Sequence, residues 1–202
     1  MDLPDLRRFT DEERHTIATC DSPEKVQSFI DAVSYSYEAD GVARLRSFRR
    51  VVRDRLAHCF EGAIAAATIL AHHGHPPRIL CMEARDIDHM MFLYREGRRL
   101  GSVAQSRDAN LKGRPPVYAT VRDLVMSYYP HYWNAITGDH SDLTLRGYSI
   151  IDLRNLEGDW MTAEDDLWPA EDLTYQAKYR ALFPENGAEE FISNRDGSIT
   201  WM

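Results

Sequence analysis

Residues 62–71 include no charged side chain, and this feature constrains the fold of the chain more than any other. Apolar side chains at Ile64, Ala67 and Leu70 continue a helical period of about 3.6 residues that starts upstream at Val51. A helix that is apolar on nearly all sides must be covered by other elements, and this one is far shorter than the roughly 20 residues needed to cross a bilayer. The sequence therefore predicts a central helix buried in a core.

The stretch just before this segment is strongly basic. It contains six arginines, which are Arg44, Arg46, Arg49, Arg50, Arg53 and Arg55. The change in composition predicts two helices joined near Ala57 and His58, an amphipathic one at the surface followed by the buried one. The arginines either attract an acidic partner or an anion, or form a solvated helix face that nearby acids balance. The second interpretation is favoured because mixed charges on a helix face usually have that role.

Strands are predicted after the buried helix, where the apolar period changes from helical to extended. Residues 78–83 are expected to form a buried strand. Residues 89–95 and 98–104 are expected to form a hairpin around Gly97, since glycine readily adopts the positive φ of a tight turn. The apolar residues 147–153 can add a strand to this sheet. This order predicts an α+β fold, with the central helix packed on an antiparallel sheet.

Flanking helices are expected on both sides of this core. Near the N-terminus, Thr10 and Glu13 have the spacing of a capping box at the start of a helix. Downstream, helices are predicted over residues 121–129 and 167–182, and residues 113–116 are predicted to form a loop.

The 202 residues are expected to fold as one domain, with a core over residues 42–130, a helical N-terminal extension over 1–41 and a C-terminal extension over 131–202. The net charge of −8 argues against a nucleic-acid partner, which needs a basic surface. Neither a leader peptide nor a membrane span is recognisable, so no membrane partner is expected. Three cysteines are few, which favours free thiols and a cytoplasmic location.

Cys59 is the clearest candidate for a reactive side chain, because it is expected at the N-terminus of the buried helix. Unpaired N–H groups and the helix dipole favour a thiolate there, and the same N–H groups can bind an oxyanion. His89 lies 30 residues after Cys59, at the start of a predicted strand that can run beside the helix start. A thiol, an imidazole and a third polar group that orients the ring form the arrangement of nucleophilic thiol catalysis.

Four short motifs resemble a known family: HCFEGA at 58–63, PRIL at 77–80, DHMMFLY at 88–94 and GRRL at 97–100. With them the chain resembles the transglutaminase-like superfamily, which has the papain-like cysteine-protease fold. The resemblance implies Cys59 as nucleophile, His89 as base and acid, and an Asp on the next strand. It implies acyl transfer to or hydrolysis of a peptide or other amide substrate through a thioester, with no cofactor and no metal.

The third catalytic position departs from the family pattern. The position across the hairpin where the family has its Asp is Ala104 in this chain, and a methyl group cannot orient an imidazole. Gln105, Ser106 and Asp108 are the candidates to replace it, and Ser102 lies on the same strand face. Gln105 matches the amide side chain of papain-like enzymes, and Asp108 offers a carboxylate.

Two other functions stay open at this point. A degenerate member of the fold, acting as a binding or scaffold module for a protein partner, is suggested by Ala104 and by the acidic, aromatic-rich C-terminal third. A redox-sensing thiol is a further alternative, distinguished by reaction with peroxide without acyl transfer. The aromatic residues at 128–133, with Trp160, Trp168 and Tyr175, either line a substrate cleft or pack in the core.

The remaining cysteines and histidines with a recognisable context are expected to be structural. Cys81 lies within an apolar strand, where a free cysteine behaves as a small hydrophobic residue. His72, His73 and His75 cluster near the end of the buried helix, where the helix dipole alone accounts for imidazole side chains. Their spacing does not match a zinc site, so no metal site is predicted there.

Overall fold

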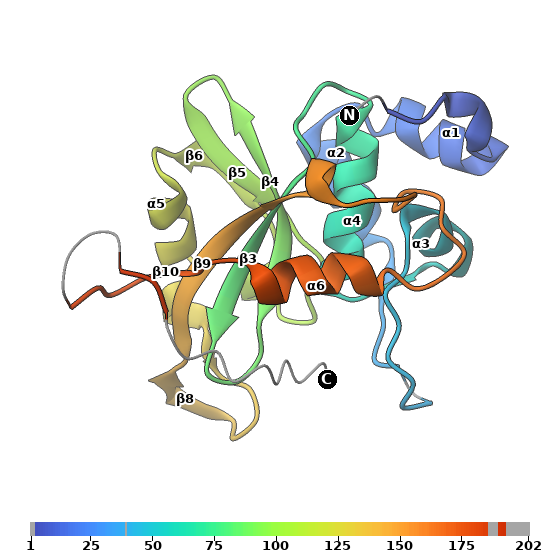
Figure 1. Cartoon of the computed structure of the whole chain (residues 1–202). Helices are drawn as coiled ribbons and strands as arrows, with labels where there is room; N and C mark the ends of the chain where they lie inside the picture. Colours follow the sequence, from blue (N-terminus) through green and yellow to red (C-terminus); the bar gives the residue numbers. More distant parts are fainter. Residues whose placement is uncertain (1–2, 39, 186–189, 193–202) are drawn as a thin grey trace.

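The computed structural model describes residues 3–38, 40–185 and 190–192 of the chain. Its centre is a six-stranded antiparallel sheet, with strands in the order β10-β9-β3-β4-β5-β6 and helices on both faces (Figure 1). The sheet strands are β3 (Arg78–Ala84), β4 (His89–Glu96), β5 (Arg99–Val103), β6 (Arg114–Tyr118), β9 (Leu145–Asp152) and β10 (Arg180–Ala181). The helices are α1 (Asp11–Thr19), α2 (Pro23–Asp31), α3 (Phe48–Asp54), α4 (Cys59–Ala71), α5 (Val121–Met126) and α6 (Trp168–Gln176). The predicted α+β class, with an antiparallel sheet and flanking helices, is confirmed.

Helix α4 is the predicted central helix, and every one of its residues is buried. It lies against β3 and β4 on one face of the sheet and against α1, α2 and α3 on its other sides (Figure 1). Gly62 approaches the segment after β5 so closely that a Cβ atom at this position would lie 2.6 Å from the Cβ of Gln105. The small residue therefore sets how near the first turn of α4 lies to the sheet.

The basic stretch forms α3 and the turn that leads into α4. Helix α3 is followed by its C-cap residue Arg55, which has a φ of 54°, and β2 (Leu56–Ala57) then pairs in parallel with β1 (Ser34–Tyr35). All six arginines form ion pairs: Arg44 with Glu38 and Asp40, Arg46 with Glu38, Asp54 and Glu61, Arg49 with Glu13, Arg50 with Asp166, Arg53 with Asp54 and Glu164, and Arg55 with Glu12. The arginines are balanced by acids as predicted, but Arg44 and Arg46 precede α3 rather than lie on it, and Arg46 is buried rather than solvated.

The hairpin of β4 and β5 is confirmed, with Gly97 at a φ of 54° in its turn. Strand β9 pairs with β3, placing Ile151 opposite Ile79, so the C-terminal part of the chain extends the same sheet. One face of the sheet packs on α4, and Cys81 lies in this core at 1% exposure, as predicted. The other face packs on α5 through a second apolar cluster, on the opposite side of the sheet from α4 (Figure 1).

Several elements differ from the sequence predictions. The helix predicted over 167–182 ends at Gln176, and Arg180–Ala181 pairs with β9 instead. The loop predicted over 113–116 is largely strand β6, which tolerates two prolines because it lies at the edge of the sheet. The hairpin of β7 (Trp133–Asn134) and β8 (Asp139–Leu143) was not predicted from the sequence. Over the described ranges, no helix combines the length and apolar character required to span a bilayer.

Candidate active site

The structure starts α4 at Cys59, as the sequence predicts, and uses His58 as the N-cap residue. The main-chain N–H of His58 donates to Oε2 of Glu61 over 2.9 Å, which closes the first turn. N–H groups at the first turn of a helix have no partner within the helix, and the positive end of the helix dipole lies there. The Cys59 thiol is 6% exposed and therefore lies in a largely dry environment at this helix end.

His89 is the first residue of β4, and it lines the same cleft as Cys59. The thiol interacts with the His89 imidazole. Nε2 of His89 donates to the main-chain carbonyl oxygen of Leu111 over 2.9 Å. Because a carbonyl oxygen can only accept, Nε2 carries the hydrogen, and Nδ1 is the ring nitrogen left to exchange a proton with the thiol. The structure thus brings together the two residues that the sequence pairs.

A second imidazole, from His58, also faces the thiol, and the sequence analysis did not assign it a role. Nε2 of His58 lies 3.0 Å from the main-chain carbonyl oxygen of Arg44, so this nitrogen carries a hydrogen by the same reasoning. The His58 side chain interacts with the Cys59 thiol. The only signal for it in the sequence is its position directly before Cys59.

The two imidazoles shift the ionisation of the thiol. Burial alone raises the pKa of Cys59, but hydrogen bonding to His58 and His89 and the charges of both rings outweigh this and lower the pKa to about 5. For His58, burial lowers the pKa, but interaction with Cys59 and the Glu61 carboxylate outweighs this and raises it to about 9. At neutral pH the site therefore holds a thiolate beside an imidazolium, which is the reactive form of a cysteine nucleophile.

The side chains predicted for the third position bond to main-chain groups, although Ser106 and Asp108 line the same cleft as Cys59 and His89. The Gln105 amide donates to the carbonyl oxygens of Ile30 and Val33, which ties α2 to the sheet. The Ser106 hydroxyl accepts from the N–H of Asp108, and the Asp108 carboxylate accepts from the N–H of Asn110. The Ser106 and Asp108 side chains thus stabilise the loop after β5 through hydrogen bonds to its backbone, whereas Gln105 bonds to the end of α2. The group that holds the His89 ring is instead the Leu111 carbonyl.

Ser102, the remaining candidate, is also committed elsewhere. Its hydroxyl bonds to the Tyr128 hydroxyl at 2.7 Å and accepts from the N–H of Arg114 at 3.0 Å. Both partners lie on the α5 side of the sheet or at its β6 edge, away from α4. Ser102 therefore fastens the edge strand.

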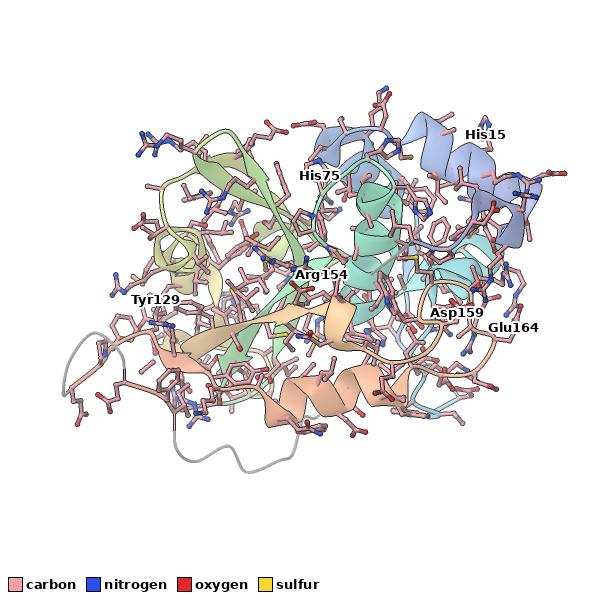
Figure 2. The ribbon with its side chains drawn as sticks, turned by 45° about the horizontal axis from the view of Figure 1, so that its top comes forward. His15, His75, Tyr129, Arg154, Asp159 and Glu164 are labelled. Atoms are coloured by element: carbon pink, nitrogen blue, oxygen red, sulfur yellow. The ribbon has the colours of Figure 1, made fainter. Side chains whose placement is uncertain are left out.

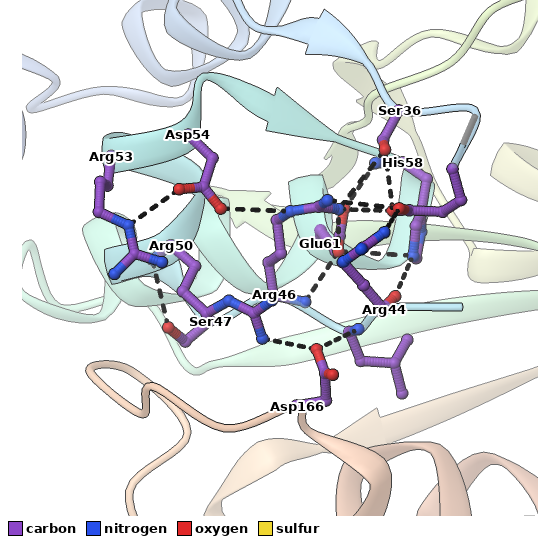
Figure 3. Close-up of polar contacts among 12 residues, drawn as sticks. Ser36, Arg44, Arg46, Ser47, Arg50, Arg53, Asp54, His58, Glu61 and Asp166 are labelled. Carbon is purple, nitrogen blue, oxygen red and sulfur yellow. Dashed lines mark hydrogen bonds and ion pairs between the residues drawn. The ribbon is translucent and has the colours of Figure 1, made fainter. Parts of the chain in front are cut away.

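Buried charges support the start of α4 (Figure 3). The Glu61 carboxylate is fully buried and accepts from both the N–H and the guanidinium of Arg46, at 2.8 and 2.9 Å. The Arg46 guanidinium also donates a hydrogen bond to the Glu38 carboxylate. Glu38 accepts further hydrogen bonds from Ser36 and Arg44. This network fixes Ser36, Glu38, Arg44 and Arg46 against the helix start, including the Arg44 carbonyl that binds His58.

A cleft of about 760 Å³ opens above Cys59 and His89. Its walls include Tyr35 and Tyr37 from the segment before α3, and Tyr132 and Trp168 from the C-terminal part. The Tyr132 hydroxyl donates to the Ile87 carbonyl over 2.6 Å, which fixes the turn just before His89. Trp133 and His131 from the aromatic stretch 128–133 also line the cleft. Trp160 is instead buried in the apolar cluster around α4, and Tyr128 in the cluster around α5.

The histidines near the end of α4 have local partners. His72 Nδ1 contacts the Thr68 carbonyl at 2.9 Å, and His73 Nε2 contacts the Ile17 carbonyl at 2.7 Å. His75 lies beyond the C-terminal end of α4 and packs edge-on against Phe92 (Figure 2). Within the described residues, no group of three or more His, Cys, Asp or Glu side chains is placed to hold a metal ion.

Comparison with known proteins identifies no family. No family model and no curated protein matches the chain. It is similar to the solved structure of Legionella pneumophila LapG, with a TM-score of 0.41 and 15% identity, covering 85% of this chain and 92% of LapG. Calcium-bound LapG gives a TM-score of 0.40 and 13% identity, covering 85% and 94%. At these values the likeness assigns no relationship, and the site is defined by the residues of this chain.

Proposed function

We propose that the protein is a cysteine-dependent acyl transferase or amide hydrolase of the transglutaminase-like kind. Cys59 is the nucleophile, and His89 is the base and acid. The observation that supports this most directly is the Cys59 thiol at the first turn of a buried helix, against an imidazole whose Nε2 is held by a carbonyl, at the bottom of a cleft. The substrate class is a peptide or other amide.

The reaction begins with attack of the Cys59 thiolate on the amide carbonyl carbon. The carbonyl oxygen gains the negative charge, and N–H groups at the start of α4 are placed to stabilise it. His89 gives its Nδ1 proton to the leaving amine, the C–N bond breaks, and a thioester on Cys59 remains. Water or an acceptor amine then attacks the thioester while His89 Nδ1 takes its proton, which restores the thiolate.

An ester that releases a coloured product tests this proposal. With p-nitrophenyl acetate we expect a burst of about one equivalent of p-nitrophenol followed by slower turnover, and mass spectrometry should find the acetyl group on Cys59. Cys59→Ala should lose both, whereas Cys20→Ala should keep both, because burial raises the pKa of the half-buried Cys20 thiol. Absence of an acetylated Cys59 in the wild-type protein contradicts the proposal.

A second candidate function is a binding or scaffold module built on the same fold. It is favoured by the third position, where His89 is held by a main-chain carbonyl rather than by a carboxylate or amide side chain. In this case the cleft binds a protein segment without reacting with it. Cys59→Ala should then leave partner binding and the biological activity intact, and the wild-type protein should not form the acetyl thioester.

A further inference from the structure

His58 and His89 face the same thiol but have different surroundings. Nε2 of His58 lies 3.0 Å from the Arg44 carbonyl oxygen and 3.7 Å from Oε1 of the buried Glu61 carboxylate. Nε2 of His89 donates instead to a neutral acceptor, the Leu111 carbonyl. A buried imidazole beside a carboxylate favours its charged form, whereas one held by a carbonyl can gain and lose a proton at its other nitrogen.

We infer that His58 keeps its positive charge throughout the reaction and holds Cys59 as a thiolate, so that only the proton on His89 moves. This inference rests on the proposed function, in which His89 is the acid and base. The thiolate faces both rings, and only His89 exchanges a proton with the substrate. His89 then gives its proton to the leaving amine and receives another from water or the acceptor amine, while His58 keeps its own.

The charges around His58 support this division of roles. Two cations, Arg44 and Arg46, pair there with four carboxylates: Glu38, Asp40, Asp54 and Glu61. Figure 3 shows Asp54 and Glu61 beside Arg46. Arg53, on the outer side, shares Asp54 with Arg46 and also pairs with Glu164, so it adds no excess positive charge. A protonated His58 compensates the excess of carboxylates at the helix start, and interaction with Glu61 and the thiolate outweighs the cost of its burial.

The groups on the open side of the thiol do not supply this charge. Burial, followed by the negative charge of Cys59, raises the pKa of Tyr35 on β1. Burial and then Asp88, Asp86 and Cys59 raise the pKa of Tyr132. Both hydroxyls are therefore neutral at physiological pH. Arg107 is the cation that faces Tyr35, and it is exposed on the cleft wall, where solvent screens it.

Two measurements on three variants separate the histidines. His58→Gln, His89→Gln and the control His72→Gln, which alters the opposite end of α4, are compared with the wild-type protein. The first measurement is the pH dependence of Cys59 alkylation by iodoacetamide, quantified on the peptide that contains Cys59. The second is the rate of deacetylation after a pulse of p-nitrophenyl acetate.

His58→Gln should move the alkylation midpoint upward from about 5, by about 1–3 pH units, as loss of an adjacent opposite charge does. Its deacetylation should be slowed less than that of His89→Gln, because His89 is still present to take the proton from water. His89→Gln should slow deacetylation by about 10²–10⁴-fold at pH values where the wild-type rate is maximal, the usual effect of losing a general base. His72→Gln should behave as the wild-type protein in both measurements.

The outcomes distinguish this inference from the proposed function. An unchanged alkylation midpoint in folded His58→Gln overturns the inference. A shifted midpoint together with a wild-type protein that never becomes acetylated supports the role of His58 and overturns the proposed function.

Nitrogen NMR of the unmodified wild-type protein covers the case in which His58→Gln does not fold. The His58 ring should show the imidazolium form at neutral pH, since its pKa is about 9. Alkylation of Cys59 should lower that pKa, because the neighbouring anion is removed. A neutral His58 ring at physiological pH in the unmodified protein overturns the inference.

Discussion

Nε2 of His89 donates a hydrogen bond of 2.9 Å to the main-chain carbonyl oxygen of Leu111. This contact fixes the ring from the short 3-10 turn Ala109–Leu111, which the Asp108 carboxylate caps through the N–H of Asn110. The orientation of the imidazole therefore depends on the conformation of a loop. Side chains in that loop therefore affect the orientation of His89 through the backbone conformation that they stabilise.

Asp108→Asn should have little effect on deacetylation. The Asp108 side chain bonds to the backbone at Asn110, and an asparagine oxygen can accept the same hydrogen bond. We expect a change of less than about threefold, against the roughly 10²–10⁴-fold loss expected when a general base is removed. Single-turnover deacetylation kinetics measure this difference. A loss of similar size in Asp108→Asn and His89→Gln would show that the carboxylate acts on His89 directly.

Arg46→Gln should destabilise the protein strongly, because it leaves the Glu61 carboxylate buried with one cation fewer. The side chains of this pair are 5% and 0% exposed, and breaking a buried pair on one side typically costs about 3–5 kcal/mol. Arg53→Gln is the matched control, since the Arg53–Glu164 pair is 55% and 60% exposed and such pairs contribute about 0–1 kcal/mol. Urea unfolding measures both. Equal losses in the two variants would contradict the importance of the buried network.

Glu38 should stabilise the protein in a way that depends on pH. Burial raises the pKa of Glu38, but hydrogen bonds from Arg46, Arg44 and Ser36 outweigh this and lower it to about 2, from 4.5 in an unfolded chain. A carboxyl whose pKa is lower in the folded than in the unfolded chain stabilises the folded protein. This contribution is complete at pH values above the unfolded pKa and is lost as the pH falls towards the folded pKa.

The difference in unfolding free energy between the wild-type protein and Glu38→Gln should therefore be constant above about pH 5 and shrink as the pH falls below the unfolded pKa of 4.5 towards 2. Urea titrations at a series of acid pH values provide this difference. A difference in unfolding free energy that does not vary with pH would show that the arginines do not lower the pKa of Glu38.

Gly62→Ala should destabilise the fold by overpacking. The added Cβ would lie 2.6 Å from the Cβ of Gln105, and forcing extra volume into a packed core typically costs about 1–3 kcal/mol. Gln105→Gly removes the opposing atom. The double variant should lose less free energy of unfolding than the sum of the two single losses. Additive losses would mean that the two residues do not meet.

The sequence predicts the central part of this fold well because its signals are local. The composition change near Ala57 marks the boundary between α3 and α4, and Gly97 marks the hairpin turn. The predictions that were wrong concern elements that form by pairing with distant parts of the chain. Strand β6 contains two prolines and exists because β5 offers it an edge, and β10 is two residues long and depends on β9.

The candidate site shows the same division. Cys59 and His89 follow from a helix start and a spacing along the chain. The carbonyl of Leu111 has no signature in the sequence, because every residue carries a carbonyl and only the loop path determines which one meets the ring. The interpretation of His58 needs Glu61 and the Arg44 carbonyl in place, and these contacts form only in the folded chain.

The cleft walls have a consequence for how such a protein can diversify. Tyr35 and Tyr37 precede the stretch that carries the Cys–His pair, and Tyr132 and Trp168 follow it. In the proposed enzyme, part of the wall that would contact a substrate therefore lies outside the stretch that carries the Cys–His pair. Tyr37 and Trp168 line the cleft, whereas Tyr132 also fixes the turn before His89 through its hydrogen bond to Ile87, so Tyr37 and Trp168 are the better starting points for directed evolution.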